Sequence, residues 1–222
     1  MDPVQFDPSD FSGRVPLFPL PNAVLFPHGL LPLHIFEERY REMTRAALAG
    51  ERLIAMALLK PGWEEQYLAN PPIHEIVGVG KVVQDSKLKD GKYNLLLFGV
   101  ARARVVEVLS DQPYRTARVE LLPERPAGAK KYERKRKLLL TFLTQVLDEL
   151  LKQGAARPPT DMPLGALCDL LASMISLETP TKQSLLEELD VAARCDRLLG
   201  LLSTPAAEES RRFRWPPEGS LN

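Results

Sequence analysis

The segment between residues 14 and 50 constrains the fold more than any other, because prolines interrupt an apolar sequence at short intervals. It begins RVPLFPLPNAVLFPHGLLPLHIFEERYREM, with prolines at positions 16, 19, 21, 27 and 32. A proline lacks the backbone N–H that a central strand uses for pairing, so it is found in edge strands and turns. The segment is therefore predicted to form edge strands and fixed turns that wrap around a core.

The spacing of apolar residues becomes helical after Phe36. Tyr40, Met43 and Ala47 fall on one face of a helix, and Leu48 extends that face. The acidic residues at positions 37 and 38 suit the positive N-terminal end of a helix, and a glycine at position 50 is placed to end it. The wrapped β segment is thus expected to lead into one packed helix.

Several short strands are predicted to follow. Residues 53–59 (LIAMALL) suit a strand that is buried on both faces, although their periodicity is also compatible with a helix. Residues 73–85 and 93–109 are rich in β-branched and aromatic residues around an Asp-Gly turn pair, Gly99 is expected to mark a bulge, and a further strand covers 114–122. Short strands with bends favour a small, partly closed β barrel.

The composition changes at residues 123–128, and only helical patterns follow. Apolar residues at helical spacing predict one helix over 130–153, a second from about Asp161, and a third that starts at Thr179 and Pro180, with Asp190 able to begin a further helix. The predicted fold class is α+β. Its predicted parts are an N-terminal tail (1–13), a β-barrel subdomain (14–124), a helical-bundle subdomain (128–203) and a C-terminal tail (204–222).

Charge and cysteine content exclude several classes of protein. Lys plus Arg and Asp plus Glu both number 29 in 222 residues, so no global field favours nucleic acid or an anionic membrane. The two cysteines, Cys168 and Cys195, are too few for a disulfide scaffold or a zinc knuckle and are predicted to be small core residues in a reducing cytosol. The N-terminus lacks the pattern of a signal peptide, and the longest apolar run is too short to span a bilayer. A cytoplasmic location is expected.

The sequence contains no motif that points to catalysis. GxxxxGK[ST], GxSxG, HExxH and CxxC are all absent. The three histidines, His28, His34 and His74, lack the spacing of metal ligands, and the glutamates near position 38 are explained by a helix N-terminus. We expect no enzymatic activity, no cofactor and no metal.

Two other features suit binding partners. The run KKYERKRK (130–137) places six cations among eight residues, which suits phosphate binding or simply a solvated helix face. Only Tyr132 is available there for base stacking, so nucleic-acid binding is the less favoured alternative. Trp63 and Tyr67 lie in a long polar loop, where they serve either as exposed anchors for a partner or as cover for the barrel.

The segments VPLFPL (15–20), NAVLFP (22–27) and PLHIFEERY (32–40) together resemble the start of the LON substrate-binding domain, the N-terminal part of the Lon ATP-dependent protease. Similar segments follow in the same order at 90–105, 113–120 and 182–199. His28 stands where this family usually has glycine, and Glu38 where proline is common. The resemblance implies a PUA-like β barrel followed by a helical bundle. The resemblance does not include the ATPase module or the peptidase module of Lon.

The resemblance also implies a substrate class. The chain is expected to be a free-standing, non-catalytic module that binds unfolded or exposed apolar polypeptide and acts as an adaptor to a protease or chaperone. The alternative is an RNA-binding PUA-like module that uses the run 130–137. The sequence suggests a contact surface made of Phe26, Pro27, His28, Trp63 and Tyr67. Charge-assisted hydrogen bonds are expected to give Glu37, Arg39 and Arg102 a structural role in holding the first helix, together with Tyr40.

Overall fold

The chain divides into two compact units between Leu122 and Pro123 in a computed structural model. The structure describes residues 6–66, 70–110, 113–152 and 159–203. We call the described residues up to Leu122 the β unit, and those from Pro123 onward the helical unit.

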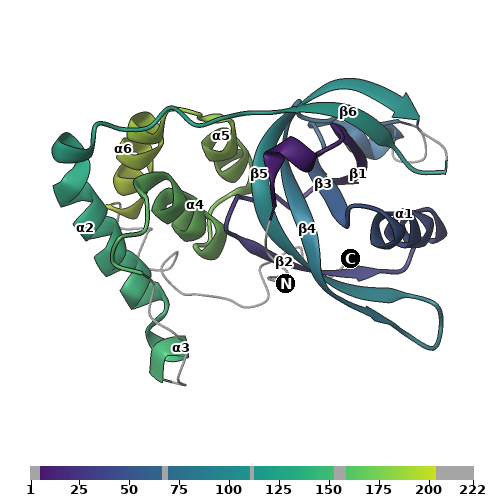
Figure 1. Cartoon of the computed structure of the whole chain (residues 1–222), viewed down its shortest axis with the longest axis horizontal. Helices are drawn as coiled ribbons and strands as arrows, with labels where there is room; N and C mark the ends of the chain where they lie inside the picture. Colours follow the sequence, from purple (N-terminus) through teal and green to yellow (C-terminus); the bar gives the residue numbers. More distant parts are fainter. Residues whose placement is uncertain (1–5, 67–69, 111–112, 153–158, 204–222) are drawn as a thin grey trace. The chain divides into compact units, whose positions relative to one another are not determined.

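The β unit contains a six-stranded sheet, one α-helix and two short 3-10 helices (Figure 1). In chain order its elements are η1 (Pro8–Asp10), β1 (Arg14–Leu20), β2 (Leu30–Ile35), α1 (Glu38–Ala49), β3 (Leu53–Leu58), η2 (Trp63–Gln66), β4 (Ile76–Lys87), β5 (Tyr93–Ser110) and β6 (Thr116–Leu121).

The sheet closes on itself through its longest strand, β5. The strand order is β2-β5-β4-β3-β1-β6, and β5 also pairs with β6, so five strands form a ring and β2 adds to its outside. β5 pairs with β2 through residues 93–98, with β4 through residues 93–104 and with β6 through residues 103–110. Ring closure therefore depends on one strand that is long enough to pair with three others.

The prediction of proline-rich edge strands is confirmed for β2 and wrong for β1. β2 lies at the end of the sheet and pairs only with β5. β1 instead lies between β3 and β6. Pro16 and Pro19 are tolerated here because residues 14–16 pair with β6 and residues 17–20 pair with β3. Neither proline therefore lies in a segment that pairs with a strand on both sides.

Two apolar cores lie on opposite faces of the sheet. β3 is buried along its whole length, as predicted. Its Ala55 and Ala57 join small residues from all five strands of the ring, whereas Ile54 and Met56 face a second core with β2 and α1. α1 packs against β1 and β3 (Figure 1), and Met43 is among its buried residues. Small side chains on one face thus let the ring close, while larger ones hold the helix.

The β4–β5 hairpin and its bulge follow the predicted pattern. Gly91 occupies the turn with a φ of 82°, a conformation that glycine adopts without strain. The pairing shifts next to Gly99, which lies opposite Gly80, while Ala101 lies opposite Val79. One extra residue on β5 therefore sits beside Gly99, and the strand changes direction there.

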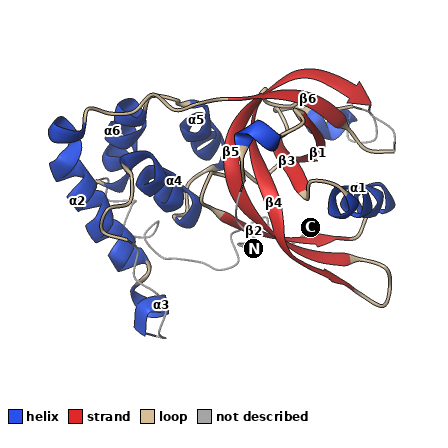
Figure 2. Ribbon diagram, in the orientation of Figure 1, coloured by secondary structure: helices blue, strands red, loops and turns tan. Residues whose placement is uncertain are grey.

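The helical unit contains only helices and one isolated β-bridge among its described residues (Figure 2). Its long predicted helix is divided in two at Leu147, and the segment from position 179 forms two helices, with Asp190 as the N-cap of the second. α4 packs against α2, α5 and α6. The helices are α2 (Ala129–Val146), α3 (Asp148–Lys152), α4 (Leu164–Met174), α5 (Thr179–Glu187) and α6 (Val191–Leu202).

A buried arginine organises the centre of this unit. Arg194 on α6 is fully buried, and its Nε lies 3.3 Å from Oδ1 of Asp169 on α4, which is 1% exposed. The same guanidinium pairs with Glu124 and donates a 2.6 Å hydrogen bond to the carbonyl of Glu188. A buried charge is tolerated only when it is paired and hydrogen-bonded, so these contacts fix α4 and α6 relative to each other.

Two kinds of feature are absent from the described part of the chain. No described helix is long and apolar enough to cross a membrane. No cluster of three or more His, Cys, Asp or Glu side chains within the described residues has the arrangement of a metal site.

Candidate functional site

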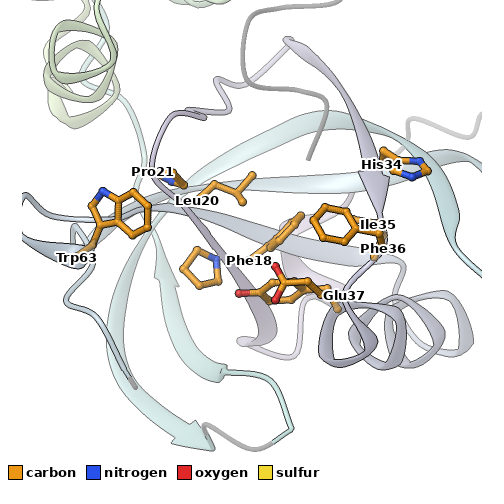
Figure 3. A pocket seen from close by; sticks show the side chains of 10 residues that line it. Phe18, Leu20, Pro21, His34, Ile35, Phe36, Glu37 and Trp63 are labelled. Atoms are coloured by element: carbon orange, nitrogen blue, oxygen red, sulfur yellow. The ribbon is translucent and has the colours of Figure 1, made fainter. Parts of the chain in front are cut away.

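The β unit carries an apolar groove of about 360 Å³ that is lined by the ends of β1 and β2 and by the start of α1 (Figure 3). Trp63 of η2 lies at one end of the groove, and His34 and Phe36 lie at the other. The remaining lining residues come from β1, the turn after it, the end of β2 and the first turn of α1: Phe18, Pro19, Leu20, Pro21, Ile35, Glu37 and Tyr40.

Aromatic rings line the floor and both ends of the groove. The rings of Phe18 and Tyr40 lie 4.5 Å apart between centroids, which packs the groove floor against α1. Phe36 is 48% exposed, and its ring stacks with that of His34 at 6.4 Å. The Nδ1 of His34 is 2.8 Å from the side-chain oxygen of Asn94 on β5, which fixes the imidazole. The groove thus has a packed aromatic floor and a half-exposed phenylalanine at one end.

An ion pair lies at the polar rim of the groove. The Nε of Arg39 donates a 2.9 Å hydrogen bond to Oε2 of Glu37, and both side chains are partly exposed. The guanidinium of Arg39 also lies over the Tyr40 ring, 4.6 Å from its centroid. Glu37 is the N-cap of α1, and its carbonyl accepts the N–H groups of the next turn. These contacts orient the first turn of α1, where Tyr40 enters the groove.

The other residues suggested as a contact surface lie elsewhere. Phe26 is fully buried and Pro27 is buried, so neither contributes to the outer surface that the sequence pattern predicted. Both precede a turn in which His28 is exposed with a φ of 64°, and the N–H of His28 donates to the carbonyl of Gly99. Tyr67 lies outside the described residues. Of the four suggested residues that the structure describes, only Trp63 lines the groove.

Arg102 lies on β5, opposite Gly78 of β4, and is 2% exposed. Its backbone carbonyl accepts the N–H of Leu122. The sequence-based hypothesis that its side chain helps to hold α1 stays a prediction.

The sequence analysis missed Phe36 as a groove residue, although strand alternation contains the signal. Leu31, Leu33 and Ile35 of β2 are buried in one core. Because neighbouring side chains on a strand point to opposite faces, the next residue after Ile35 turns outward. An apolar residue at such a position is a candidate for partner contact.

Three of the four cations whose side chains are described in the basic run at the start of α2 contact carboxylates. The Nζ of Lys135 lies 2.5 Å from Oδ1 of Asp196, and this ion pair raises the pKa of Lys135. Arg136 and Lys137 both contact Glu133, at 3.0 and 4.0 Å. These cations already have carboxylate partners within the chain, which weakens the case for a phosphate-binding patch.

The known proteins that the chain resembles are Lon proteases and their N-terminal domains. The chain is 28% identical over 212 residues to a Lon protease of Anaeromyxobacter dehalogenans, an alignment that covers 90% of this chain but 24% of that protease. The chain therefore spans about a quarter of the length of that relative.

Two solved structures share the fold. The Lon N-terminal domain protein of Xanthomonas campestris matches with a TM-score of 0.60 and 24% identity, over 84% of this chain and 97% of that one. The N-terminal domain of Mycobacterium avium complex Lon protease matches with a TM-score of 0.63 and 19% identity, over 86% and 99%. The family model of the ATP-dependent protease La (LON) substrate-binding domain matches residues 14–204. The chain belongs to the LON substrate-binding domain family.

Proposed function

We propose that this chain is a non-catalytic module that binds unfolded or exposed apolar polypeptide in the groove between Trp63 and Phe36. The family is described by its substrate-binding role, and its longer relatives are Lon proteases. The observation that carries the proposal is Phe36, which remains 48% exposed beside an apolar groove. An exposed apolar surface with a polar rim is typical of protein contact sites.

On its β1 side, the groove suits capture of side chains better than addition of a strand. The N–H of Leu17 donates to the carbonyl of Arg115 on the β6 side of β1. Residues two apart on a strand direct their backbone groups to the same side, so Pro19 also faces that side but has no N–H to donate. Pro21 follows and lacks a donor as well. A client is therefore expected to bind through large apolar side chains, each contributing about 1.5–3 kcal/mol when fully buried.

The finer architecture and cellular role are part of the proposal. The closed sheet supports a PUA-like barrel, and the packing of α4 against three other helices supports a helical bundle. The division between Leu122 and Pro123 supports subdomains over 14–124 and 128–203. We assign the module a cytoplasmic role in protein quality control, in which it presents clients to a protease or a chaperone.

A binding experiment with an unfolded protein tests the proposal. Fluorescence anisotropy of labelled, reduced and carboxymethylated α-lactalbumin measures capture by the purified chain. Phe36→Ala and Trp63→Ala are each expected to weaken binding at least tenfold. Val106→Ala is the control, because Val106 is 41% exposed on β5 and does not line the groove. Unchanged affinity in both groove variants would refute the assignment of the site.

Salt dependence separates apolar capture from binding of a polyanion. Apolar burial is maintained or strengthened by salt, whereas a complex with several phosphate contacts weakens by orders of magnitude between about 50 and 200 mM salt. Capture that collapses in this range, and that added RNA displaces, would favour the nucleic-acid alternative and overturn the proposal.

A further inference from the structure

The helical unit brings together the only two cysteines in the chain. Cys168 lies on α4 and Cys195 on α6, and both are fully buried free thiols. The Cys168 thiol donates a hydrogen bond to the sulfur of Cys195. The two sulfurs therefore face each other across the contact between two helices.

An ion pair next to the cysteines is a second observation, separate from the hydrogen bond between the thiols, that places them close together. Asp169 follows Cys168 on α4, and Arg194 precedes Cys195 on α6. The 3.3 Å contact between Arg194 and Asp169 fixes the register of these two helices. Each cysteine is one residue from this contact, so both lie at the same level of the two packed helices. A disulfide requires two Cβ atoms at short separation, and this register brings the two cysteines into the same helix–helix contact.

We propose that Cys168 and Cys195 are a redox-modification site that forms a reversible disulfide between α4 and α6. The inference is independent of the groove in the β unit, because both cysteines and the ion pair that sets their register belong to the helical unit. It also changes the prediction that these residues are only core packing. Cytosolic disulfides, where they occur, are usually transient and serve redox sensing.

The two thiols differ in character, which assigns a role to each. The hydrogen bond from Cys168 lowers the pKa of Cys195, and the cations Lys135 and Arg194 act in the same direction. The same hydrogen bond, followed by burial, raises the pKa of Cys168. The thiolate is the reactive form, so Cys195 is the attacking residue and Cys168 resolves the intermediate.

The oxidant that fits a buried pair is a small peroxide. The Cys195 thiolate attacks one oxygen of hydrogen peroxide and breaks the O–O bond, which gives a sulfenic acid and hydroxide, and hydroxide takes up a proton. The Cys168 sulfur then attacks the sulfenic sulfur, loses its proton and displaces water. In total, two thiols and one hydrogen peroxide give one disulfide and two waters, with both sulfurs oxidised and both peroxide oxygens reduced.

The test uses the full chain, treated with hydrogen peroxide under native conditions and then alkylated. Intact mass is expected to show the loss of two hydrogens and no alkylation, and peptide mapping should join the peptides of Cys168 and Cys195. The melting temperature of the helical unit should rise by about 5 to 10 °C, because the bridge restricts the unfolded chain. Dithiothreitol should reverse both changes.

Cys168→Ser and Cys195→Ser are the matched controls. Each is expected to form no intramolecular bridge, to show no rise in melting temperature with peroxide, and to be alkylated once in its reduced state. The Cys168→Ser variant should accumulate sulfenic acid at Cys195, detected by dimedone labelling.

Three results with the wild-type chain would overturn the proposal, and none of them depends on the folding of a variant. In the first, both thiols of the native chain stay intact under peroxide treatment that oxidises the urea-unfolded chain. In the others, disulfides link only separate chains, or the cysteines oxidise to sulfinic or sulfonic acid without forming a bridge.

Discussion

The backbone carbonyl of Phe26 lies so close to the Cα of Gly99 that a side chain on Gly99 would overlap it. This contact seats the turn before β2 against the bulge in β5, and the N–H of Gly99 donates to the carbonyl of Gly29 in the same region. A close approach of two backbones is one of the few situations that only glycine satisfies.

Gly99→Ala is therefore expected to destabilise the β unit. The added methyl group must displace backbone rather than a flexible side chain, and overpacking of this kind costs about 1–3 kcal/mol. Urea unfolding followed by circular dichroism measures the loss. Gly200→Ala is the control, because Gly200 lies on α6 with open space where the β-carbon of an alanine would lie. That change should stabilise its helix by up to about 1 kcal/mol, and a similar gain for Gly99→Ala would contradict the prediction.

His28→Gly is expected to stabilise the chain. His28 holds a left-handed conformation with a φ of 64°, which costs a residue with a side chain roughly 1–2 kcal/mol and glycine very little. After the greater flexibility of glycine in the unfolded chain is subtracted, a net gain of about 0.5–1 kcal/mol remains. Thermal melting tests this gain. His34→Gly serves as the comparison and should destabilise, because it places glycine within β2 and removes the contact with Asn94.

Asp169→Ala is expected to be among the most damaging substitutions in the helical unit. It leaves the buried Arg194 without one of its carboxylates, and the loss of one partner from a buried pair costs about 3–5 kcal/mol. The free energy of unfolding in urea is the measurement. Asp148→Ala breaks an exposed ion pair with Lys152 and should change the free energy of unfolding by less than about 0.5 kcal/mol. Equal effects of the two changes would show that burial does not govern the contribution of the pair.

The N-cap of α6 is expected to weaken in acid. The Asp190 carboxylate accepts the N–H groups of Ala192 and Ala193, and the hydrogen bond from Ala193 is the main reason that its pKa lies below the usual 3.8. Because the pKa of Asp190 is lower in the folded state than in the unfolded state, its carboxylate contributes fully to the free energy of unfolding above about pH 3.8. This stabilisation is lost as the pH falls through the pKa of the folded state.

Asp190→Asn separates this titration from the cap itself. Asparagine also caps a helix, but it carries no charge and does not titrate. The melting temperature of the variant should approach that of the wild type as the pH falls from 5 to 2. A constant difference between the two over this range would argue against the cap as the titrating contact.

Local patterns predicted most elements of the fold, because their causes are local. The Asp90-Gly91 pair sets the hairpin turn, and the alternation of apolar residues sets the strands around it. Asp190 begins α6 because its side chain can cap it. The position of β1 could not be predicted in this way. Its neighbours are chosen by pairing with distant strands, and the prolines by themselves indicated an edge.

The groove was harder to predict because exposure depends on what covers each residue. Phe26 and Pro27 belong to an apolar run, but the close contact with Gly99 buries them. Trp63 lines the groove only because its loop returns beside the end of β1. The register that joins Cys168 to Cys195 was likewise outside the reach of sequence spacing, since it depends on how α4 and α6 pack.

The divided pairing of β1 also sets an order of events during synthesis. Val15 pairs with Ala117, about 100 residues later, whereas the second half of β1 pairs with β3 much sooner. At roughly 5–20 residues per second, the ribosome leaves this first strand without its β6 partner for about 5–20 seconds. The nascent chain thus displays its own apolar N-terminal segment while the ring is open, and β6 completes the β unit when it emerges.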